Sequence, residues 1–357
     1  MWYGNLTEIQ FAYLLIIPTL LVLALVMFYP IINVFWQSLH FERLNQPARG
    51  TPFIGLEHYR RMLWGNAMQW NLMHQWPWRA LGLSGLLWLA YAAKRRWLNR
   101  REAVLWALLL LLIFGLWLGF HPQEGGRWGD LRFWNSLRVT LLFTFISVTG
   151  AFLIGLPLAL LANVTSRWRW LMRVSLLLPW AMPRVFTGLT FAWLFQNQYG
   201  LFNDILQRVG IEGPLWLSRE MPALVAVNIT IIWQTSSFVG LILLAGLQSI
   251  DESLYEAAMV DGASMWQRFW SITMPLLRPA IAIALISRTI TALQTFDIPF
   301  AMTRGGPGRS LETLGIYIYN TTLGLNIGYA AALSVLLFVV SFAVTILYMR
   351  WVYTDSR

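Results

Sequence analysis

The sequence predicts an all-α protein that crosses a membrane several times. Of its 357 residues, 57% are hydrophobic and 12% are charged, which is about half the charged share of an ordinary soluble domain. Too few polar groups remain to cover a globular surface, and the apolar residues gather in runs long enough to cross a bilayer. These runs lack the alternation of a β-barrel, so we expect helices, whose backbone polar groups bond within the segment.

Eight apolar stretches reach the roughly 20 residues that about 30 Å of hydrocarbon requires. They are predicted near 11–36, 76–93, 103–120, 136–162, 174–195, 222–247, 276–298 and 326–349. The second and third are about 18 residues long, close to the lower limit, so two helices lying in the membrane interface are the alternative there. The basic turn between them, residues 94–101, favours a transmembrane hairpin.

The Lys and Arg residues assign each loop a side of the membrane. Basic clusters at 94–101 and 163–173 belong in the cytoplasm under the positive-inside rule. Eight spans then place both termini and the 248–275 loop in the cytoplasm. The loops predicted to lie outside are 37–75, 121–135, 196–221 and 299–325. Because these clusters account for the net charge of +10, we expect no nucleic-acid partner.

The residue inventory excludes several kinds of site. The chain has no cysteine, so thiolate metal ligands and cysteine nucleophiles are absent, and its four histidines match no metal-ligand spacing. We find no paired carboxylates and no nucleophile–base set that would support an integral-membrane enzyme. No Gly-x-x-x-x-Gly-Lys-Ser/Thr loop is present, so the chain is not expected to bind or hydrolyse ATP by itself.

The predicted cytoplasmic loop 248–275 carries the most informative segment. At 256–263 it reads EAAMVDGA, a run of helix formers followed by an Asp-Gly pair that suits a turn and the N-cap of a second helix. The candidate residues are Glu256, Ala257, Ala258, Asp261, Gly262 and Ala263. An amphipathic helix pair can insert into a groove of a cytoplasmic partner and transmit motion, or it can rest on lipid. Periodicity alone favours the lipid interpretation.

Glu-Ala-Ala, three residues, Gly, and then a later Ile and Pro resemble the signature loop of binding-protein-dependent ABC importer permeases. The full run EAAMVDGASMWQRFWSITMPLLRP is similar to the carbohydrate branch of that family, the maltose and glycerol-phosphate type. The similarity extends over most of 11–64 and 130–350, including Leu178-Pro179 and Gly305-Gly306-Pro307. The resemblance implies a core of six helices and a coupling role for the six candidate residues, which would dock on an ATPase.

The resemblance also implies partners. These are a second permease subunit, two ABC ATPase subunits that bind ATP and Mg, an external solute-binding protein, a sugar as cargo, and the plasma (inner) membrane of a bacterium or archaeon. Residues 65–129 depart from the family pattern. The predicted division is therefore 1–64 (first core helix and external loop), 65–129 (inserted transmembrane hairpin) and 130–357 (permease core with the coupling loop).

Two arginines inside predicted spans mark a candidate substrate pathway. On straight helices Arg184 and Arg288 would lie about 15 Å and about 18 Å from the cytoplasmic edge, near the midplane where transporters often bind substrate. A charge there costs at least about 2.5–3.5 kcal/mol, so it should face protein or water. Asp297, about 31 Å in, lies nearer the external edge. The arginines can bond carbonyls freed by nearby prolines, an acid of a partner, or the cargo; the structural roles are preferred.

Neutral polar residues complete the candidate pathway. Thr291, Thr295 and the neighbouring Gln294 share one side of the seventh span with Arg288, by the i, i+3, i+7 rule. The full candidate set is Arg184, Asn228, Gln234, Thr235, Arg288, Thr291, Gln294 and Thr295. Hydroxyl and amide groups suit a small neutral saccharide, which is the preferred cargo. The arginines leave open an anionic sugar derivative or glycerol phosphate. An ion-driven secondary transporter is disfavoured, because intramembrane acids are absent.

Overall fold

The computed structural model describes residues 7–65, 68–70, 76–94, 106–107, 110, 120–122, 129–164 and 169–354. The chain divides into two compact units. One comprises Met1–Phe53 together with Asn135–Arg357, and the other is Ile54–Trp134. The first boundary follows Phe53, and the second, after Trp134, falls in the first turn of one long helix, α6 (Leu131–Asn163).

The larger unit begins with one long apolar helix. It consists of α1 (Glu8–Leu23), a π-helical turn η1 (Ala24–Phe28) and α2 (Tyr29–Ser38). The stretch Phe11–Ser38 is long and apolar enough to cross a membrane, where the sequence predicts a span at 11–36. Its side chains are exposed along nearly the whole length, as expected for a helix that meets lipid. The C-terminal part, α2, packs against α16 (Ile327–Thr354).

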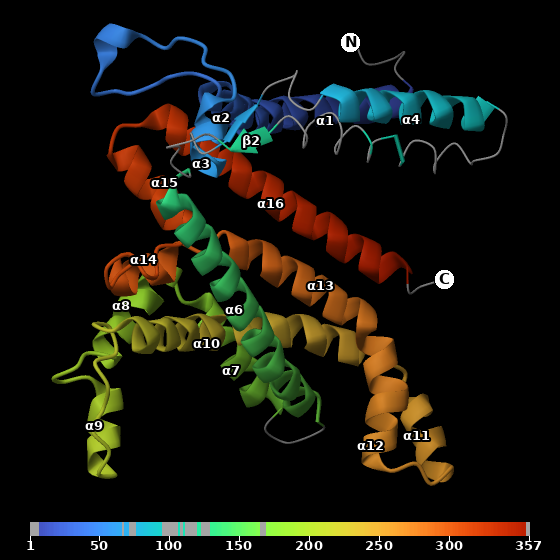
Figure 1. Ribbon diagram of the computed structural model, residues 1–357. Helices are drawn as coiled ribbons and strands as arrows, with labels where there is room; N and C mark the ends of the chain where they lie inside the picture. Colours follow the sequence, from blue (N-terminus) through green and yellow to red (C-terminus); the bar gives the residue numbers. More distant parts are fainter. Residues whose placement is uncertain are drawn as a thin grey trace, which may run out of the picture. The chain divides into compact units, whose positions relative to one another are not determined.

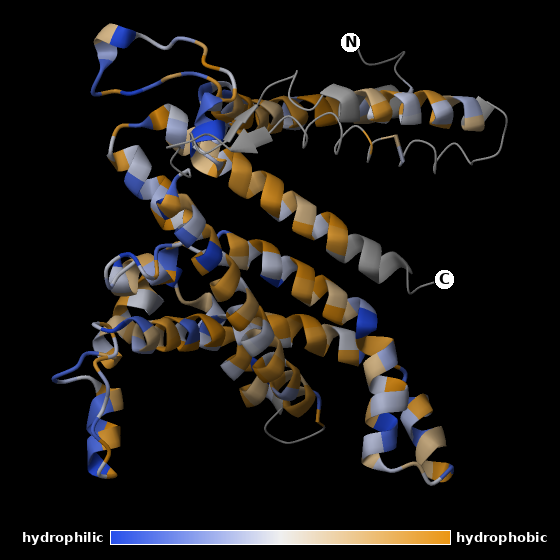
Figure 2. Cartoon of the chain, in the orientation of Figure 1, coloured by the Kyte–Doolittle hydropathy of each residue, from blue (hydrophilic) through white to orange (hydrophobic). Residues whose placement is uncertain are grey.

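Four further helices form the body of this unit. They are α6, α10 (Glu220–Gln248), α13 (Met274–Leu293) and α16, and each lies in a segment long and apolar enough to span a membrane. Figure 1 shows α13 between α10 and α16, and Figure 2 shows hydrophobic residues along all three. The buried residues form two clusters, one around Phe143 and Val227 and the other around Leu243 and Leu277.

Helices α6 and α10 lie close together at two glycines. A Cβ at Gly155 would lie 2.9 Å from the carbonyl oxygen of Ser236, and one at Gly240 would lie 3.2 Å from that of Gly155. Membrane helices gain little from burying apolar surface, because lipid is equally apolar, so small residues that allow close backbone packing stabilise their crossings. These two glycines therefore allow α6 and α10 to pack closely at this point.

The predicted straight span at 174–195 is wrong in its geometry. The structure has two helices, α7 (Arg169–Ala181) and α8 (Arg184–Leu194), and the stretches Trp170–Ala181 and Arg184–Leu194 meet at an angle of 94°. Pro183 is the N-cap of α8, with ψ of 131°. A proline disfavours the helical conformation of the residue before it, here Met182, so the helix breaks at this point. The depth of Arg184 estimated along a straight helix does not apply.

The seventh predicted span, 276–298, ends earlier than expected. Gln294 is the C-cap of α13, and after Phe296 a short helix, α14 (Asp297–Thr303), runs on. Helix α14 packs closely on α8, since a Cβ at Gly188 would lie 2.7 Å from the Cβ of Ala301. Helix α15 (Leu314–Leu323) then packs on α16. These turns bring the start of α14 back beside the start of α8.

The smaller unit contains α3 (Glu57–Leu63), β1 (Met68–Trp70), α4 (Trp76–Lys94) and β2 (Phe120–Pro122). The strands pair antiparallel, with Gln69 opposite His121, and so bring together the two ends of the segment between them. In α3 the Arg60 side chain donates to Glu57 at 2.7 Å, and this hydrogen bond, aided by Arg61, lowers the pKa of Glu57 to about 2. The strand pair is an exception to the predicted all-α architecture, which the rest of the described chain confirms.

The described residues contain five helical segments that are long and apolar enough to cross a membrane, or six when α7 and α8 count as one broken span. Eight were predicted. Of the remaining two, 76–93 coincides with α4, whose apolar part, Ala80–Ala92, falls below the length of a clear span. Most of 103–120 lies outside the described residues. The helical bundle is thus confirmed, and the eight-span count stays a prediction.

Candidate functional site

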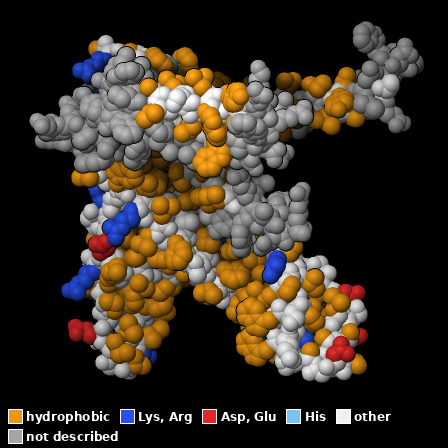
Figure 3. Space-filling view, turned by 45° about the vertical axis from the view of Figure 1, so that its right-hand side comes forward, with side chains coloured by type: hydrophobic (Ala, Val, Ile, Leu, Met, Phe, Trp, Pro, Cys, Tyr) orange, Lys and Arg blue, Asp and Glu red, His pale blue; other side chains and the backbone are white. Residues whose placement is uncertain are grey.

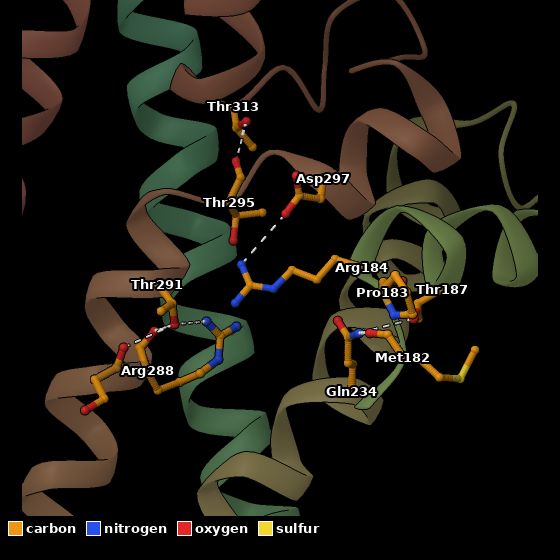
Figure 4. Close-up of polar contacts among 11 residues, drawn as sticks. Met182, Pro183, Arg184, Thr187, Gln234, Arg288, Thr291, Thr295, Asp297 and Thr313 are labelled. Atoms are coloured by element: carbon orange, nitrogen blue, oxygen red, sulfur yellow. Dashed lines mark hydrogen bonds and ion pairs between the residues drawn. The ribbon is translucent and has the colours of Figure 1, made fainter. Parts of the chain in front are cut away.

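Four helices contribute to one polar pocket in the larger unit. The ends of α8, α13 and α14 meet there beside the middle of α10 (Figure 4). The pocket is lined by Arg184, Ile231, Gln234, Thr235, Arg288, Thr291, Thr295, Phe296, Asp297 and Ile298. Six of the eight predicted pathway residues are among them. Helices that end at a common point thus place side chains from distant parts of the sequence in one site.

Arg288 is the deepest charge of the pocket. Its side chain belongs to α13, and the residue is only 2% exposed. Nη2 donates to Ser147 Oγ on α6 at 2.8 Å, and Nη1 donates to Thr291 Oγ1 at 3.3 Å. Nε is buried without a hydrogen-bond partner in the described structure, and within the same residues Arg288 forms no ion pair. Its charge is therefore held by two neutral hydroxyl groups.

Arg184 lies beside an acidic residue, Asp297, and the sequence did not predict this pair. Nη1 lies 3.8 Å from Oδ2 of Asp297, and both side chains remain partly exposed (Figure 4). The expectation that Asp297 lies at a different depth is wrong. The 94° break turns Arg184 out of a straight helix, and the end of α13 at Gln294 lets Asp297 begin a new helix beside it. Two local interruptions of helices thus create the pair.

Gln234 joins α10 to the break between α7 and α8. Its Nε2 donates to the carbonyl oxygen of Met182 at 2.8 Å and approaches Thr187 Oγ1 at 3.1 Å. Met182 lies in the break, outside both helices, so its carbonyl oxygen needs a partner from another segment. Gln234, rather than an arginine, satisfies it. Among the described residues, the hydrogen bonds of the Arg288 guanidinium go to hydroxyl groups instead.

Two predicted pathway residues do not line the pocket. Asn228 is buried and donates to the carbonyl oxygen of Leu224 in its own helix at 2.8 Å. Gln294 is exposed at the end of α13. Both residues were predicted because all polar residues of a span were assumed to face the same pathway. Phe296 and Asp297 were missed as members of the wall, although the prolines at 179 and 183 signal the broken helix that brings Arg184 to them.

The pocket is small in this conformation. Its volume is about 20 Å³, close to the space that one water molecule needs. Aromatic rings can bind the face of a sugar, but Trp193, Trp233 and Tyr317 are not among its lining residues. A saccharide therefore requires either a wider conformation or a wall contributed by another subunit.

The loop 248–275 forms the expected helix pair. Helix α11 spans Glu252–Val260 and α12 spans Met265–Arg268, which continues through the π-turn η5 (Phe269–Thr273) into α13. Asp251 caps α11 by accepting the N–H of Ser253 at 3.0 Å, and this backbone hydrogen bond lowers the pKa of Asp251. The expected N-cap at Asp261-Gly262 is wrong: Asp261 is the C-cap of α11, and Ser264 caps α12 in a capping box with Gln267.

The turn between the two helices depends on Gly262. Its φ of +77° is a left-handed conformation that glycine adopts at little cost, and an added Cβ would meet no atom of the described part of the chain within 4 Å. The tip beside it is apolar and exposed, with Val260 at 89% and Met265 at 81%. Tyr255 and Thr273 hydroxyls lie 3.0 Å apart and tie α11 to η5, so that the pair projects as one piece (Figures 1 and 3). Residues Glu256, Ala257, Ala258 and Ala263 belong to this projection.

Comparison with known proteins places these features in context. A family described as "Binding-protein-dependent transport system inner membrane component" matches residues 151–353. The sulfoquinovosyl glycerol transport system permease protein SmoG of Agrobacterium fabrum is 54% identical over 240 residues, covering 67% of this chain and 78% of that protein. The trehalose/maltose transport system permease protein MalF of Thermococcus litoralis is 33% identical over 343 residues, covering 96% of this chain and 94% of that protein.

The fold is also similar to a solved transporter. The crystal structure of a bacterial ABC transporter involved in the import of the acidic polysaccharide alginate superposes with a TM-score of 0.69, over 97% of this chain and 96% of that chain. The sequence identity is 20%, so this similarity concerns the fold. It extends over both units of the chain.

Proposed function

Because the chain belongs to the family of binding-protein-dependent transport system inner membrane components, we propose that it is the membrane-spanning permease subunit of an ATP-driven importer for a carbohydrate. The observation that carries the proposal is the alignment of 96% of the chain with a trehalose/maltose permease. The relative named for sulfoquinovosyl glycerol, itself a sugar derivative, supports the same class of cargo. The projecting pair α11–α12 supplies a surface through which a separate ATPase can act.

The proposed transporter consists of several chains with different roles. Two ABC ATPase subunits bind ATP and Mg and hydrolyse ATP, and this chain carries no cofactor of its own. An external solute-binding protein delivers the sugar, and a second permease subunit completes the pathway. A pocket with room for about one water molecule supports this last point, since a sugar needs further space and further walls.

Within the polar pocket we assign the neutral groups to the sugar. Hydroxyls of Thr235, Thr291 and Thr295 line it, and sugars bind through many such hydrogen bonds. The coupling role is assigned to the segment Glu256–Ala263. Residues 65–129 are proposed as an inserted, peripheral hairpin between the first core helix and the rest of the permease, an arrangement that the β1–β2 pairing supports.

We propose that the protein lies in the plasma membrane. Both termini and the basic turn at 94–101 then face the cytoplasm. Because the native chain has no cysteine, single thiols report accessibility cleanly. A cysteine replacing Asn99 should react with a membrane-impermeant maleimide only after the cells are permeabilised. As the matched control, Ser218→Cys, at an exposed position of the predicted external loop 196–221, should react in intact cells. Labelling of Asn99→Cys from outside would contradict the hairpin orientation.

The function is tested by reconstitution. The two permeases, the ATPase and the solute-binding protein should together import a labelled sugar into proteoliposomes only when ATP is enclosed with the ATPase, and omission of this chain should abolish uptake. Uptake driven by a proton or sodium gradient without ATP would instead identify a secondary transporter. Failure of the assembled complex to import any carbohydrate, neutral or anionic, would refute the proposed cargo class.

A further inference from the structure

The polar pocket carries an excess of positive charge. Two arginines and one aspartate line it, so its described wall has a net charge of +1. The pocket also lies at the N-terminal end of α8, which begins with Arg184, and the positive end of a helix dipole favours an anion. In a setting poor in water such a charge is costly unless a counter-charge is present for part of the transport cycle.

The two arginines differ in how they are held. Arg288 is fixed: it is nearly fully buried, bonded to hydroxyls of α6 and α13, and its Nε has no partner in the described structure. Arg184 is loosely held: its side chain is 52% exposed and its contact with Asp297, at 3.8 Å, is longer than a charged hydrogen bond. The first is a permanent positive charge, and the second can exchange its partner.

We infer that the imported sugar carries an anionic group, and that this group enters between Arg184 and Arg288 in place of the Asp297 carboxylate. The inference rests on the proposed function and specifies its substrate class. A sulfonate, carboxylate or phosphate presents several oxygens that guanidinium groups bind well, whereas a neutral sugar offers no counter-charge for Arg288. Asp297 holds Arg184 in position while the pocket is empty of cargo.

The relatives are consistent with this choice over the neutral saccharide that the sequence alone favours. The protein named for sulfoquinovosyl glycerol, a sulfonated sugar, shares 54% of residues over the aligned 240, against 33% for the trehalose/maltose permease over 343. The competing explanation is that a carboxylate of the second permease neutralises the pocket. The test must separate these two sources of negative charge.

The assembled transporter, with its solute-binding protein omitted, is used for equilibrium binding. The probes are sulfoquinovosyl glycerol and glucosyl glycerol, in which a hydroxyl replaces the sulfonate. Arg184→Gln should weaken binding of the sulfonated probe at least about tenfold and change binding of the neutral probe less than about twofold. Arg184→Lys should retain much of the discrimination. Asp297→Asn should strengthen binding of the sulfonated probe, because it removes the internal competitor.

The matched control is Arg208→Gln. Arg208 likewise pairs with an aspartate of this chain, Asp204 at 2.9 Å, but lies on α9 (Leu201–Arg208) away from the pocket, so both probes should bind it normally. Equal binding of the two probes to the unaltered complex, or equal losses in Arg184→Gln, would overturn the inference in favour of a partner carboxylate. Because the neutral sugar would still bind in that case, the proposed function would stand; if neither probe nor trehalose binds, both fail.

Discussion

Replacing Gly262 by valine is expected to abolish transport while the protein remains inserted and assembled. The backbone at this position has a φ of +77°, which a β-branched residue adopts only at a cost of roughly 1–2 kcal/mol. The strain is relieved by changing the turn, which moves α12 relative to α11 and so alters the exposed tip that carries Val260 and Met265. Since no atom of the described residues lies within 4 Å of an added Cβ, the new side chain is also free to project from the tip, which is where we propose that the ATPase docks.

Transport, ATP hydrolysis and the yield of complex are measured together for this variant. Gly210 serves as a matched control, because its φ is +78° and an added Cβ there likewise meets no described residue within 4 Å. Gly210→Val carries the same backbone strain at the end of α9, far in sequence from the coupling loop, and should transport normally. Normal uptake by Gly262→Val, or equal losses in both variants, would remove the coupling role from this loop.

Replacing Arg288 by glutamine is expected to lower uptake of an anionic sugar at least about tenfold with little loss of assembled complex. The variant removes the fixed charge of the pocket. Because Arg288 has no ion-pair partner among the described residues, its removal also lifts a desolvation penalty, and the glutamine amide retains hydrogen-bonding capacity. The measurement is uptake of sulfoquinovosyl glycerol beside the yield of the purified complex.

The variant Ser147→Ala distinguishes the effect of the Arg288 charge from the effect of its hydrogen bond to α6. It removes the 2.8 Å hydrogen bond from Arg288 to α6 and leaves the guanidinium charge in place. Uptake by this variant should stay within about twofold of the unaltered protein. If Arg288→Gln instead loses complex and uptake together, and Ser147→Ala behaves likewise, Arg288 serves the structure of α6 and α13, which is the role expected for a neutral cargo.

Composition and local pattern alone determined the class of the protein and most of its helices. Runs of about 20 apolar residues have few alternatives to helices in lipid, because each backbone polar group must bond within the segment. The helix pair at 252–268 was also predicted, because its helix formers and the turn between them are local features, although the caps at Asp251 and Ser264 were not. The Glu-Ala-Ala loop likewise indicated the family, because its motif is one contiguous run of residues.

Only the tertiary structure decided the composition of the pocket. Depth counted along straight helices placed Asp297 far from Arg184, yet the break at Pro183 and the end of α13 at Gln294 bring the two within 3.8 Å. Polarity within a span likewise could not tell Asn228, which bonds to its own helix, from Gln234, which bridges to the broken one. Which side chain meets which depends on where helices stop and cross, and those positions are fixed by contacts between segments distant in the chain.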